Sequence, residues 1–431
     1  MKNAAISVIM PSLNVVQYIE KALTSALEQT LEDLEIICVD AGSTDGTLEI
    51  LEKYRDKDSR IRLLMSDHKS YGTQVNLGIK AATGKYIAIL ETDDYIDPKM
   101  YEALYTAAEG NDCDFVKCNF HRYWTQKDGT PYMNTRYNLW DRSLYNKVIV
   151  SPDPKDVCIN DLYLWDGIYK KSFLEENGIE FSETDGAAFQ DIGFLFQTGV
   201  CGKRIMYLPE PYYFYCVDRE SSSSNSDRGL LYSFHEYNFV YARYREAIRQ
   251  DKAVEKAFYC MVALTLYWTE TDYLKSYGIS AKPFYDWLLN EVRWAADNGI
   301  ITDDDTNFDL PIRSLLIPFE EYRKRRRERE DYLLSVLGEV GDNRIVVFGC
   351  GNLGIYAYRW TVRQGYTVDG FIDNDAAKWD DSIDGVAISD PNKIDGDDEG
   401  VRYVVANMMY SDEMKQQLLK LGVKEQHICL F

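Results

Sequence analysis

The first ninety residues alternate between short, apolar, β-branched runs and longer amphipathic segments. The short runs predict strands, and the segments with apolar residues at helical spacing predict helices. Because such an alternation builds a mostly parallel sheet with helices on its faces, the sequence predicts an α/β fold. Open sheets of this class bind ligands at the carboxyl ends of their strands, so we expect the functional site at that edge. Strands are expected at 6–10, 35–39, 61–65 and 86–90, and helices at 16–29, 47–54 and 74–82.

The acidic stretch Glu91, Thr92, Asp93 and Asp94 directly follows the fourth predicted strand. Clustered carboxylates repel one another and are costly to desolvate, so a buried core does not favour them. A divalent cation that carries a phosphate ester would turn the same cluster into a binding site. We therefore predict a metal–phosphate site here, the alternative being a solvated acidic turn.

Several ordered motifs in the first half of the chain resemble those of a known family. The segments ISVIMPSLNVVQYIEKAL, VDAGSTDGTLEIL and NLGIKAATGKYIAILETDDYIDP are similar to the nucleotide-binding half of family 2 glycosyltransferases, of the inverting GT-A type. Residues 164–181 and 189–194 resemble the acceptor-side segment of that family, and residues 212–225 resemble its closing Arg-x-x-Ser-x-Ser segment. The resemblance implies a GT-A nucleotide-diphospho-sugar transferase domain over residues 1–225.

The resemblance also implies roles for individual side chains. Asp40 would accept a hydrogen bond from the nucleotide base, the alternative being an Asx turn or a helix cap. Asp93 would bind a Mg²⁺ or Mn²⁺ ion that bridges the donor diphosphate, and Asp94 would be a further ligand or a support. The remaining positions implied in nucleotide-sugar binding are Pro11, Ser12, Leu13, Asn14, Gly42, Ser43, Asn76, Glu91 and Thr92.

Asp191 is the predicted catalytic base. Inverting transfer is a single in-line displacement, so it needs one carboxylate to take the proton of the acceptor hydroxyl. It does not need the second, nucleophilic carboxylate of a retaining glycosidase. A helix cap at Asp191 is an alternative that is compatible with catalysis. Arg219, next to a serine run, would fold over the pyrophosphate, unless that segment is a plain loop.

The chain departs from the usual family pattern at five positions. Leu13 stands for Tyr, Ala41 for Asp, Val75 for Arg, Glu91 for Asp and Gln190 for Glu. The missing arginine removes a cation expected near the diphosphate, which leaves the metal and Arg219 to compensate. Val75 and Gln190 motivate an alternative function, a non-catalytic protein that binds nucleotide sugars.

Residues 226–340 are predicted to form a helical connector region. Apolar and aromatic residues are dispersed without strand alternation over 230–250, 253–277 and 283–298, and another helix runs to about residue 337. A basic run at 323–329 has acidic flanks, which favours a solvated helix with i,i+4 ion pairs. Contact with anionic lipid headgroups is the alternative for this run.

Residues 341–431 are predicted to form a Rossmann-like domain of the nucleotide-binding type. A strand at 344–348 leads into Gly349, Gly351 and Gly354, a GxGxxG pattern that opens a helix. Asp373 follows the next strand, where a dinucleotide fold places an acid on the ribose. The domain is expected to bind a nucleotide or to be purely structural. An NAD-linked oxidoreductase is a further alternative, disfavoured because no Tyr-x-x-x-Lys motif accompanies the glycines.

Composition limits the partners and the compartment. The formal net charge of −22 argues against a nucleic-acid partner. No leader peptide and no apolar run long enough to span a bilayer is apparent, and nine cysteines without a CxxC pair indicate reduced thiols. We therefore expect a cytoplasmic enzyme, or one at the inner face of the membrane with at most peripheral contact. It would move a sugar from a nucleotide-diphosphate donor to a glycan or lipid-linked acceptor in bacterial surface polysaccharide synthesis.

Overall fold

The chain folds into two compact units, which we describe separately. The larger unit comprises Met1–Tyr123 and Thr135–Leu316, and the C-terminal unit comprises Trp124–Asn134 and Ile317–Phe431. The computed structural model describes residues 4–139, 141–160, 162–217, 228–270, 279–306, 311–338, 344–379, 381–407 and 410–431. The division into domains at 225/226 and 340/341 stays a prediction.

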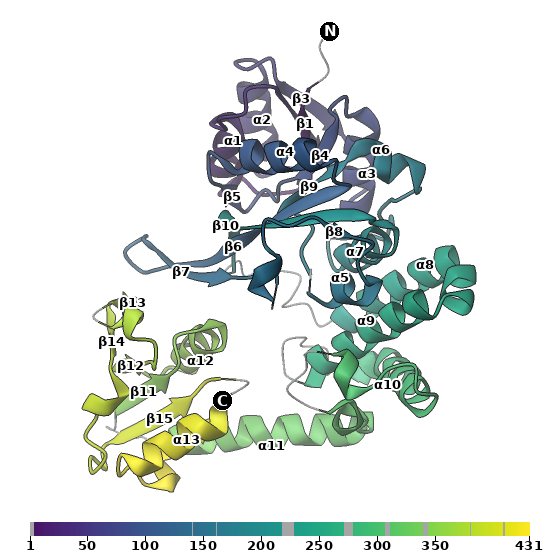
Figure 1. The fold of residues 1–431 in the computed structure, drawn as a ribbon. Coiled ribbons are helices and arrows are strands. Elements are labelled where there is room, and N and C mark those ends of the chain that lie inside the picture. Colours follow the sequence, from purple (N-terminus) through teal and green to yellow (C-terminus); the bar gives the residue numbers. More distant parts are fainter. Residues whose placement is uncertain are drawn as a thin grey trace. The chain divides into compact units, whose positions relative to one another are not determined.

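The predicted strand–helix series forms one half of the large sheet of the larger unit (Figure 1). Its strands are parallel, as the alternation predicted, and their order is β3-β2-β1-β4. Helix α1 begins three residues later than expected, because the N–H groups of Val15 and Val16 donate to Thr47 Oγ1 and Asp45 Oδ2 instead. The elements are β1 Ile6–Ser12, α1 Ile19–Leu27, β2 Leu34–Asp40, α2 Thr47–Arg55, β3 Ile61–Met65, α3 Tyr71–Ala81 and β4 Tyr86–Ile89.

The sheet continues beyond β4 in the order β4-β9-β6-β10-β5. Strand β9 runs antiparallel to both of its neighbours, and β10 lies parallel to β6. This second half brings residues near 165–215 beside the first four strands. Its elements are β5 Tyr95–Ile96, α4 Met100–Asn111, β6 Phe115–Thr125, β7 Pro131–Arg136, η1 Arg142–Leu144, β8 Ile149–Val150, α5 Pro154–Asn160, β9 Gly167–Lys170, α6 Lys171–Glu176, α7 Gln190–Cys201 and β10 Arg204–Cys216.

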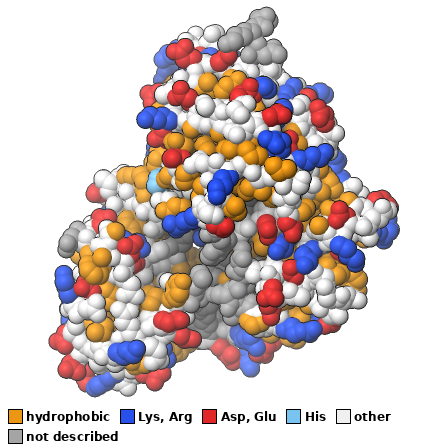
Figure 2. Space-filling model, in the orientation of Figure 1, with side chains coloured by type: hydrophobic (Ala, Val, Ile, Leu, Met, Phe, Trp, Pro, Cys, Tyr) orange, Lys and Arg blue, Asp and Glu red, His pale blue; other side chains and the backbone are white. Residues whose placement is uncertain are grey.

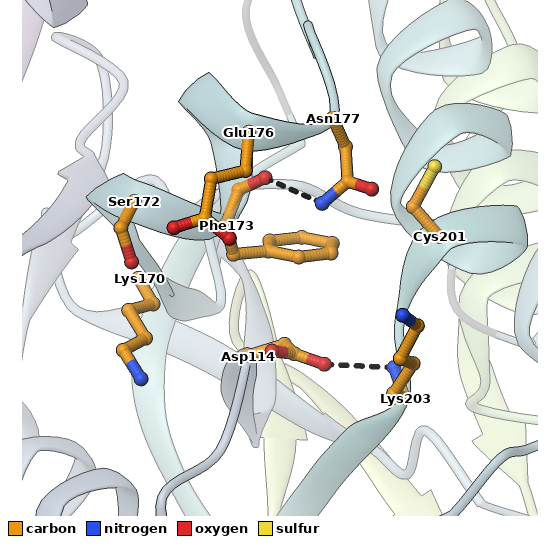
Figure 3. A pocket seen from close by; sticks show the side chains of 8 residues that line it. All are labelled: Asp114, Lys170, Ser172, Phe173, Glu176, Asn177, Cys201 and Lys203. Atoms are coloured by element: carbon orange, nitrogen blue, oxygen red, sulfur yellow. Dashed lines mark hydrogen bonds between the residues drawn. The ribbon is translucent and has the colours of Figure 1, made fainter.

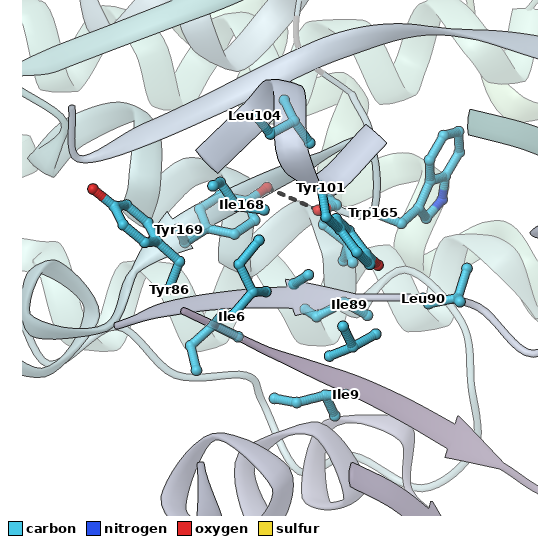
Figure 4. Packing of buried hydrophobic residues seen from close by; sticks show 14 of the residues in the cluster. Ile6, Ile9, Tyr86, Ile89, Leu90, Tyr101, Leu104, Trp165, Ile168 and Tyr169 are labelled. Carbon is cyan, nitrogen blue, oxygen red and sulfur yellow. Dashed lines mark hydrogen bonds between the residues drawn. The ribbon is translucent and has the colours of Figure 1, made fainter. Parts of the chain in front are cut away.

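The core of the larger unit lies on both faces of the central strands. All residues of β1 and β2 are buried, as expected for parallel strands covered by helices on both sides. Figure 4 shows how Ile6, Ile89 and Tyr169 pack beneath Tyr101 and Leu104 of α4. The packing fixes the strands, so the loops at their carboxyl ends project from a rigid base.

Three long helices follow the sheet, close to the predicted ranges. Helix α8 packs on α7, and α9 packs on α5, α8 and α10. None of the helices within the described ranges combines the length and the apolar character that a bilayer crossing requires. The elements are α8 Gly229–Gln250, α9 Lys252–Glu270, η3 Ile279–Ala281, α10 Lys282–Asp297, η4 Asp303–Asp305 and η5 Ile312–Leu315.

The C-terminal unit holds a second sheet, as the predicted return of strand–helix alternation indicated. Its order is β13-β14-β12-β11-β15-β16, with parallel pairing throughout except between β13 and β14. The Rossmann-like assignment stays a prediction. The elements are α11 Phe319–Gly338, β11 Arg344–Phe348, α12 Asn352–Arg363, β12 Gly370–Ile372, η6 Ala376–Lys378, β13 Ser382–Ile383, β14 Val386–Ser389, η7 Pro391–Lys393, β15 Val401–Val405, α13 Ser411–Lys420, η8 Glu425–His427 and β16 Ile428–Leu430.

The basic run on α11 is paired with neighbouring acids. Arg325 Nε lies 3.1 Å from Glu321 Oε1, and Lys324 Nζ lies 3.7 Å from Glu328 Oε1. The predicted i,i+4 pairs are therefore present. Figure 2 shows acidic and basic side chains interspersed over the visible face, so the acidic excess is spread over that face rather than gathered in one patch.

Candidate active site

The loops that follow β1 and β2 are tied together at the carboxyl edge of the sheet. The Asn14 N–H donates to Ser43 Oγ at 2.9 Å, and Asn14 Oδ1 accepts from the Thr44 N–H at 2.9 Å. Asn14 has a φ of +53°, a left-handed conformation that asparagine tolerates better than most residues. The structure thus brings together two of the predicted donor-binding residues, Asn14 and Ser43.

Asp40 is completely buried at the end of β2. Its Oδ1 accepts from the N–H groups of Gly42 and Ser43 at 2.9 and 2.7 Å. Its Oδ2 accepts from the hydroxyls of Ser12 and Ser43 at 2.8 and 2.7 Å. These four bonds use about as many acceptor sites as a carboxylate offers. The Asx-type turn that the sequence left open is present, and Asp40 organises the loop on which Ser43 stands.

Gln74 on α3 is a buried residue of this edge that sequence reasoning missed. Its Nε2 donates to the carbonyls of Ser12 at 2.9 Å and Val39 at 2.7 Å, so it joins the last residues of β1 and β2. Thr92 Oγ1 donates to the Pro11 carbonyl at 3.1 Å and ties the acidic loop to the same place. A glutamine on the buried face of a predicted helix was the available signal.

The carboxylates of the acidic loop after β4 differ in burial. Asp94 is buried, and its oxygens accept from the Tyr213 hydroxyl and the Cys216 N–H, both at 2.7 Å. Burial, followed by the charge of Asp93, raises the pKa of Asp94 well above its ordinary value. Asp94 is therefore held by β10 and supports the loop, whereas Asp93 is only partly buried.

Tyr71, at the start of α3, binds the first acid of this loop and was also missed. Its hydroxyl donates to Glu91 Oε1 at 2.5 Å, and its ring meets Phe181 edge-on with centroids 5.9 Å apart. Burial, and then the charge of Glu91, raises the pKa of the Tyr71 hydroxyl well above its ordinary value. The hydroxyl consequently stays protonated and donates to Glu91 at neutral pH.

Asn76, predicted to bind the nucleotide sugar, holds a neighbouring segment of the chain. Its Nδ2 donates to the Phe181 carbonyl at 3.0 Å and to Glu183 Oε1 at 3.2 Å, and its Oδ1 accepts from the Phe181 N–H at 3.0 Å. The Tyr71 N–H donates to the Gly186 carbonyl at 2.8 Å. The segment that leads to Asp191 is thus fastened to α3, beside the acidic loop.

Asp191 lies in the first turn of α7, where its Oδ1 accepts from the Ile192 N–H at 3.0 Å. Burial raises its pKa to about 6, although backbone hydrogen bonds act in the opposite direction. The predicted cap is not present, because α7 begins at Gln190 with Phe189 as its N-cap and without a side-chain cap hydrogen bond. The raised pKa suits a carboxylate that takes up a proton. Arg219 lies outside the described residues.

A second carboxyl, Glu236 of α8, is buried near Asp191 and had no signal in the sequence. Its Oε1 accepts from the Ser182 hydroxyl, and its Oε2, among the described residues, has no hydrogen-bond partner. Burial raises the pKa of Glu236 to about 8, and the charge of Asp191 adds to the rise. At neutral pH the two acids therefore carry different protonation states, with Glu236 neutral and Asp191 ionised.

The residues at this edge fit a metal that arrives with a phosphate rather than a preformed cage. Among the described residues, no three His, Cys, Asp or Glu side chains are grouped closely enough to hold a metal ion. Mg²⁺ commonly takes only one or two carboxylates together with substrate phosphates and water. Asp93, with Glu91 close by in the chain, fits that donor set.

Comparison with known proteins identifies the family of this chain. Glycosyltransferase GlyG of Streptococcus pneumoniae is 31% identical over 216 residues, which are 49% of this chain and 70% of GlyG. The chain belongs to glycosyltransferase family 2. The profile described as Glycosyl transferase family 2 matches residues 7–159, a range that includes the loops after β1, β2 and β4. Family 2 transferases of this fold generally use a divalent metal.

Other relatives of this family 2 chain extend the comparison. The uncharacterized glycosyltransferase EpsJ of Bacillus subtilis is 31% identical over 225 residues, so the matched part spans 51% of this chain but only 62% of EpsJ. The structure of S. aureus TarS 1-349, in complex with UDP-GlcNAc, gives a TM-score of 0.56 at 20% identity, covering 74% of this chain and 89% of that one. This likeness shows the fold, and the predicted GT-A class is confirmed.

The C-terminal unit matches a different profile, described as C2185-like, N-terminal, over residues 341–429. Its glycine-rich loop is a tight turn. Gly349 has a φ of +106°, and a Cβ on Gly354 would lie 1.8 Å from the Gly349 carbonyl oxygen. Gly349 and Gly354 are therefore explained by the turn and by the close approach of α12 to it, whereas a Cβ at Gly351 would meet nothing within 4 Å.

A cavity of about 230 Å³ lies at the amino-terminal edge of the parallel strands, away from the acidic loop. Figure 3 shows Asp114, Lys170 and Lys203 around it, together with side chains of α6. Lys170 is engaged by Asp112 at 2.7 Å, and Asp114 accepts from the Lys203 N–H at 2.7 Å. The cavity contains none of the predicted donor-binding residues.

Proposed function

We propose that this family 2 protein is a metal-dependent, inverting glycosyltransferase. It moves a sugar from a nucleoside-diphosphate donor to a glycan or lipid-linked acceptor in bacterial surface polysaccharide synthesis, from the cytoplasmic side. The observation that carries the proposal is the meeting of three elements at one sheet edge: the Asp40 loop, the acidic loop after β4, and the segment that ends at Asp191.

The donor nucleotide occupies the loops after β1 and β2. Pro11, Ser12 and Leu13 form the wall of the base pocket, and Asn14, Gly42 and Ser43 line it. Leu13 is only partly buried, which leaves apolar surface for a base. Since both oxygens of Asp40 are occupied by its own loop, direct contact with the base requires the exchange of one serine hydroxyl for a base N–H.

Asp93, assisted by Glu91, holds Mg²⁺ or Mn²⁺ against the donor diphosphate. When bound, such a cation would supply positive charge to the departing diphosphate. Asp94 keeps the loop in position through Tyr213 and Cys216 and is not itself required as a ligand. The hydroxyl of Tyr71 keeps Glu91 oriented.

Asp191 takes the proton from the attacking acceptor hydroxyl. With a pKa of about 6, roughly nine-tenths of the molecules hold Asp191 ionised at pH 7. Glu236, being neutral, adds no competing negative charge beside it. One base is sufficient, because the acceptor oxygen itself attacks the anomeric carbon.

The non-catalytic alternative is motivated by Val75 and Gln190. Val75 is completely buried, and its apolar side chain supplies no cation to the diphosphate. Gln190 donates to Thr184 Oγ1 at 3.1 Å and braces the segment before α7, a role that does not require a carboxylate. Both departures therefore leave Asp93 and Asp191 in place, which favours the enzyme.

Calorimetric titration with UDP, GDP, CDP, dTDP and NAD, with and without Mn²⁺, tests the proposal. We expect one diphosphate to bind, to need the metal, and to lose its affinity in Asp93→Ala. Glu176→Gln, an exposed acid beside the cavity at the opposite edge, is the matched control and should bind as the wild type does. Metal-independent binding of NAD alone, unchanged by Asp93→Ala, would contradict the proposal.

A further inference from the structure

The glycine-rich loop of the C-terminal unit is covered by a hairpin from the same unit. Residues 124–134, which we term the hairpin arm, include the end of β6 and the start of β7, and they form part of the C-terminal unit. The arm contacts the glycine-rich loop, one of the two features from which the sequence predicted a nucleotide site, at Cys350. The contacts of the arm therefore bear on whether the glycine-rich loop can bind a nucleotide.

The arm reaches the centre of the loop. The Tyr132 hydroxyl donates to the Cys350 carbonyl at 3.1 Å, and Asn134 Nδ2 donates to the same oxygen at 3.3 Å. Tyr132 is 7% exposed and Cys350 is completely buried. Cys350 is the residue between the first two glycines of the motif, so the arm rests on the turn itself.

A second pair of hydrogen bonds fixes the tip of the arm. The Lys127 N–H donates to Asp384 Oδ1 at 2.9 Å, and the Asp384 N–H donates to Gln126 Oε1 at 2.7 Å. The two bonds run in opposite directions between the same two short segments. Such reciprocal pairing sets the register of the arm on the turn between β13 and β14.

Asp373, the acid expected to bind ribose, is occupied. Its Oδ2 accepts from the Cys350 N–H at 2.7 Å and from Lys378 Nζ at 3.1 Å, and its Oδ1 accepts from the Asp375 N–H at 2.8 Å. It is 8% exposed. These bonds use three of the roughly four acceptor sites of the carboxylate, and two of them come from backbone N–H groups that hold the turn. A ribose that takes both hydroxyls to this acid would have to break them, so the residues present do not fit a dinucleotide.

We propose that the loop 349–354 is a docking seat for the hairpin arm and not a dinucleotide site. The Cys350 carbonyl of the seat accepts hydrogen bonds from two side chains of the arm, and the Cys350 N–H donates to the buried Asp373. The seat thereby fixes the arm within the C-terminal unit. This inference is independent of the sugar-transfer proposal, because it uses neither the acidic loop nor Asp191.

Hydrogen exchange on the full-length protein tests the seat, with Tyr132→Phe as the perturbation. The amides of Lys127 and Asp384 report docking, because each donates across the contact between the arm and the turn that follows β13. Loss of the Tyr132 bond should speed exchange of both amides by about fivefold, since one buried hydrogen bond is worth about 1 kcal/mol. Tyr137→Phe, in the larger unit and 45% exposed, is the control and should change neither rate.

Asn134→Ala provides a second, milder variant that removes the other bond to Cys350 and should speed the same two amides. NAD and NADP at millimolar concentration should leave the exchange of the Cys350 amide unchanged in the wild type. Unchanged Lys127 and Asp384 exchange in both variants would overturn the proposal. Protection of the Cys350 amide by NAD or NADP, with one molecule bound per chain, would overturn it as well.

Discussion

Replacing Asp191 by asparagine should stabilise the protein while it slows transfer by about 10²- to 10⁴-fold. The carboxyl is ionised at neutral pH although its burial disfavours the charged form, and asparagine keeps the oxygen that accepts from the Ile192 N–H. Its pKa rises from 3.8 to about 6 on folding, which corresponds to about 3 kcal/mol. Catalytic groups commonly carry such a stability cost.

The sign follows from the direction of the rise. Below about pH 4, Asp191 is protonated in both the folded and unfolded states, so the variant and the wild type should have similar free energies of unfolding. As the pH rises through about 6, ionisation favours the unfolded wild type, and the variant does not follow. The difference should grow over this range and reach at most about 3 kcal/mol at pH 7.

Urea denaturation of both proteins at several pH values between 4 and 8 measures this difference. Asp185→Asn, an exposed acid in the segment before α7, should show no comparable gain. In the wild type, kcat/KM should fall by about tenfold between pH 7 and pH 5, because the ionised fraction falls from about nine-tenths to about one-tenth. The reasoning would be refuted if Asp191→Asn and the wild type were equally stable at pH 7, or if the kcat/KM of the wild type did not change between pH 7 and pH 5.

Three further substitutions test the packing around the site, each by urea denaturation. Gly193→Ala should cost about 1–2 kcal/mol, because its Cβ would lie 2.5 Å from Glu236 Oε2; no change would mean that this carboxyl moves freely. Gln74→Ala should cost about 1–2 kcal/mol, since two buried carbonyls each lose one donor while the Ser12 carbonyl keeps the Ala41 N–H; a neutral result would contradict the bracing role. Asp94→Ala should cost about 2–4 kcal/mol by leaving the Cys216 N–H and a tyrosine hydroxyl unsatisfied, and Asp94→Asn should cost less; equal losses would contradict support by β10.

The elements of the first half of the sheet could be predicted, because apolar periodicity sets each of them locally. Strand β3 and the start of α2 fall on the predicted residues. The start of α1 could not be predicted. It depends on Asp45 and Thr47, which reach back from the next loop and hold the N–H groups of residues 15 and 16.

Site residues with a motif were easier to foresee than those that act through packing. Asp93 and Asp191 stand in motifs that single them out. Tyr71, Gln74 and Glu236 do not, because their roles arise only when α3, the acidic loop and α8 come together in three dimensions. A residue that stands in a motif can also have a structural role: the Asn76 side chain is hydrogen-bonded to the carbonyl and the N–H of Phe181.

Release of nucleoside diphosphate from a panel of nucleotide sugars, followed in the presence of Mn²⁺ by the wild type and Asp191→Asn, tests the central claim most directly. We expect the wild type to release diphosphate from one donor. Asp191→Asn should be slower by about 10²- to 10⁴-fold, because a general base is lost, while its affinity for the free diphosphate stays unchanged. Equal release by the two proteins, or diphosphate binding without any turnover in the wild type, would contradict the account.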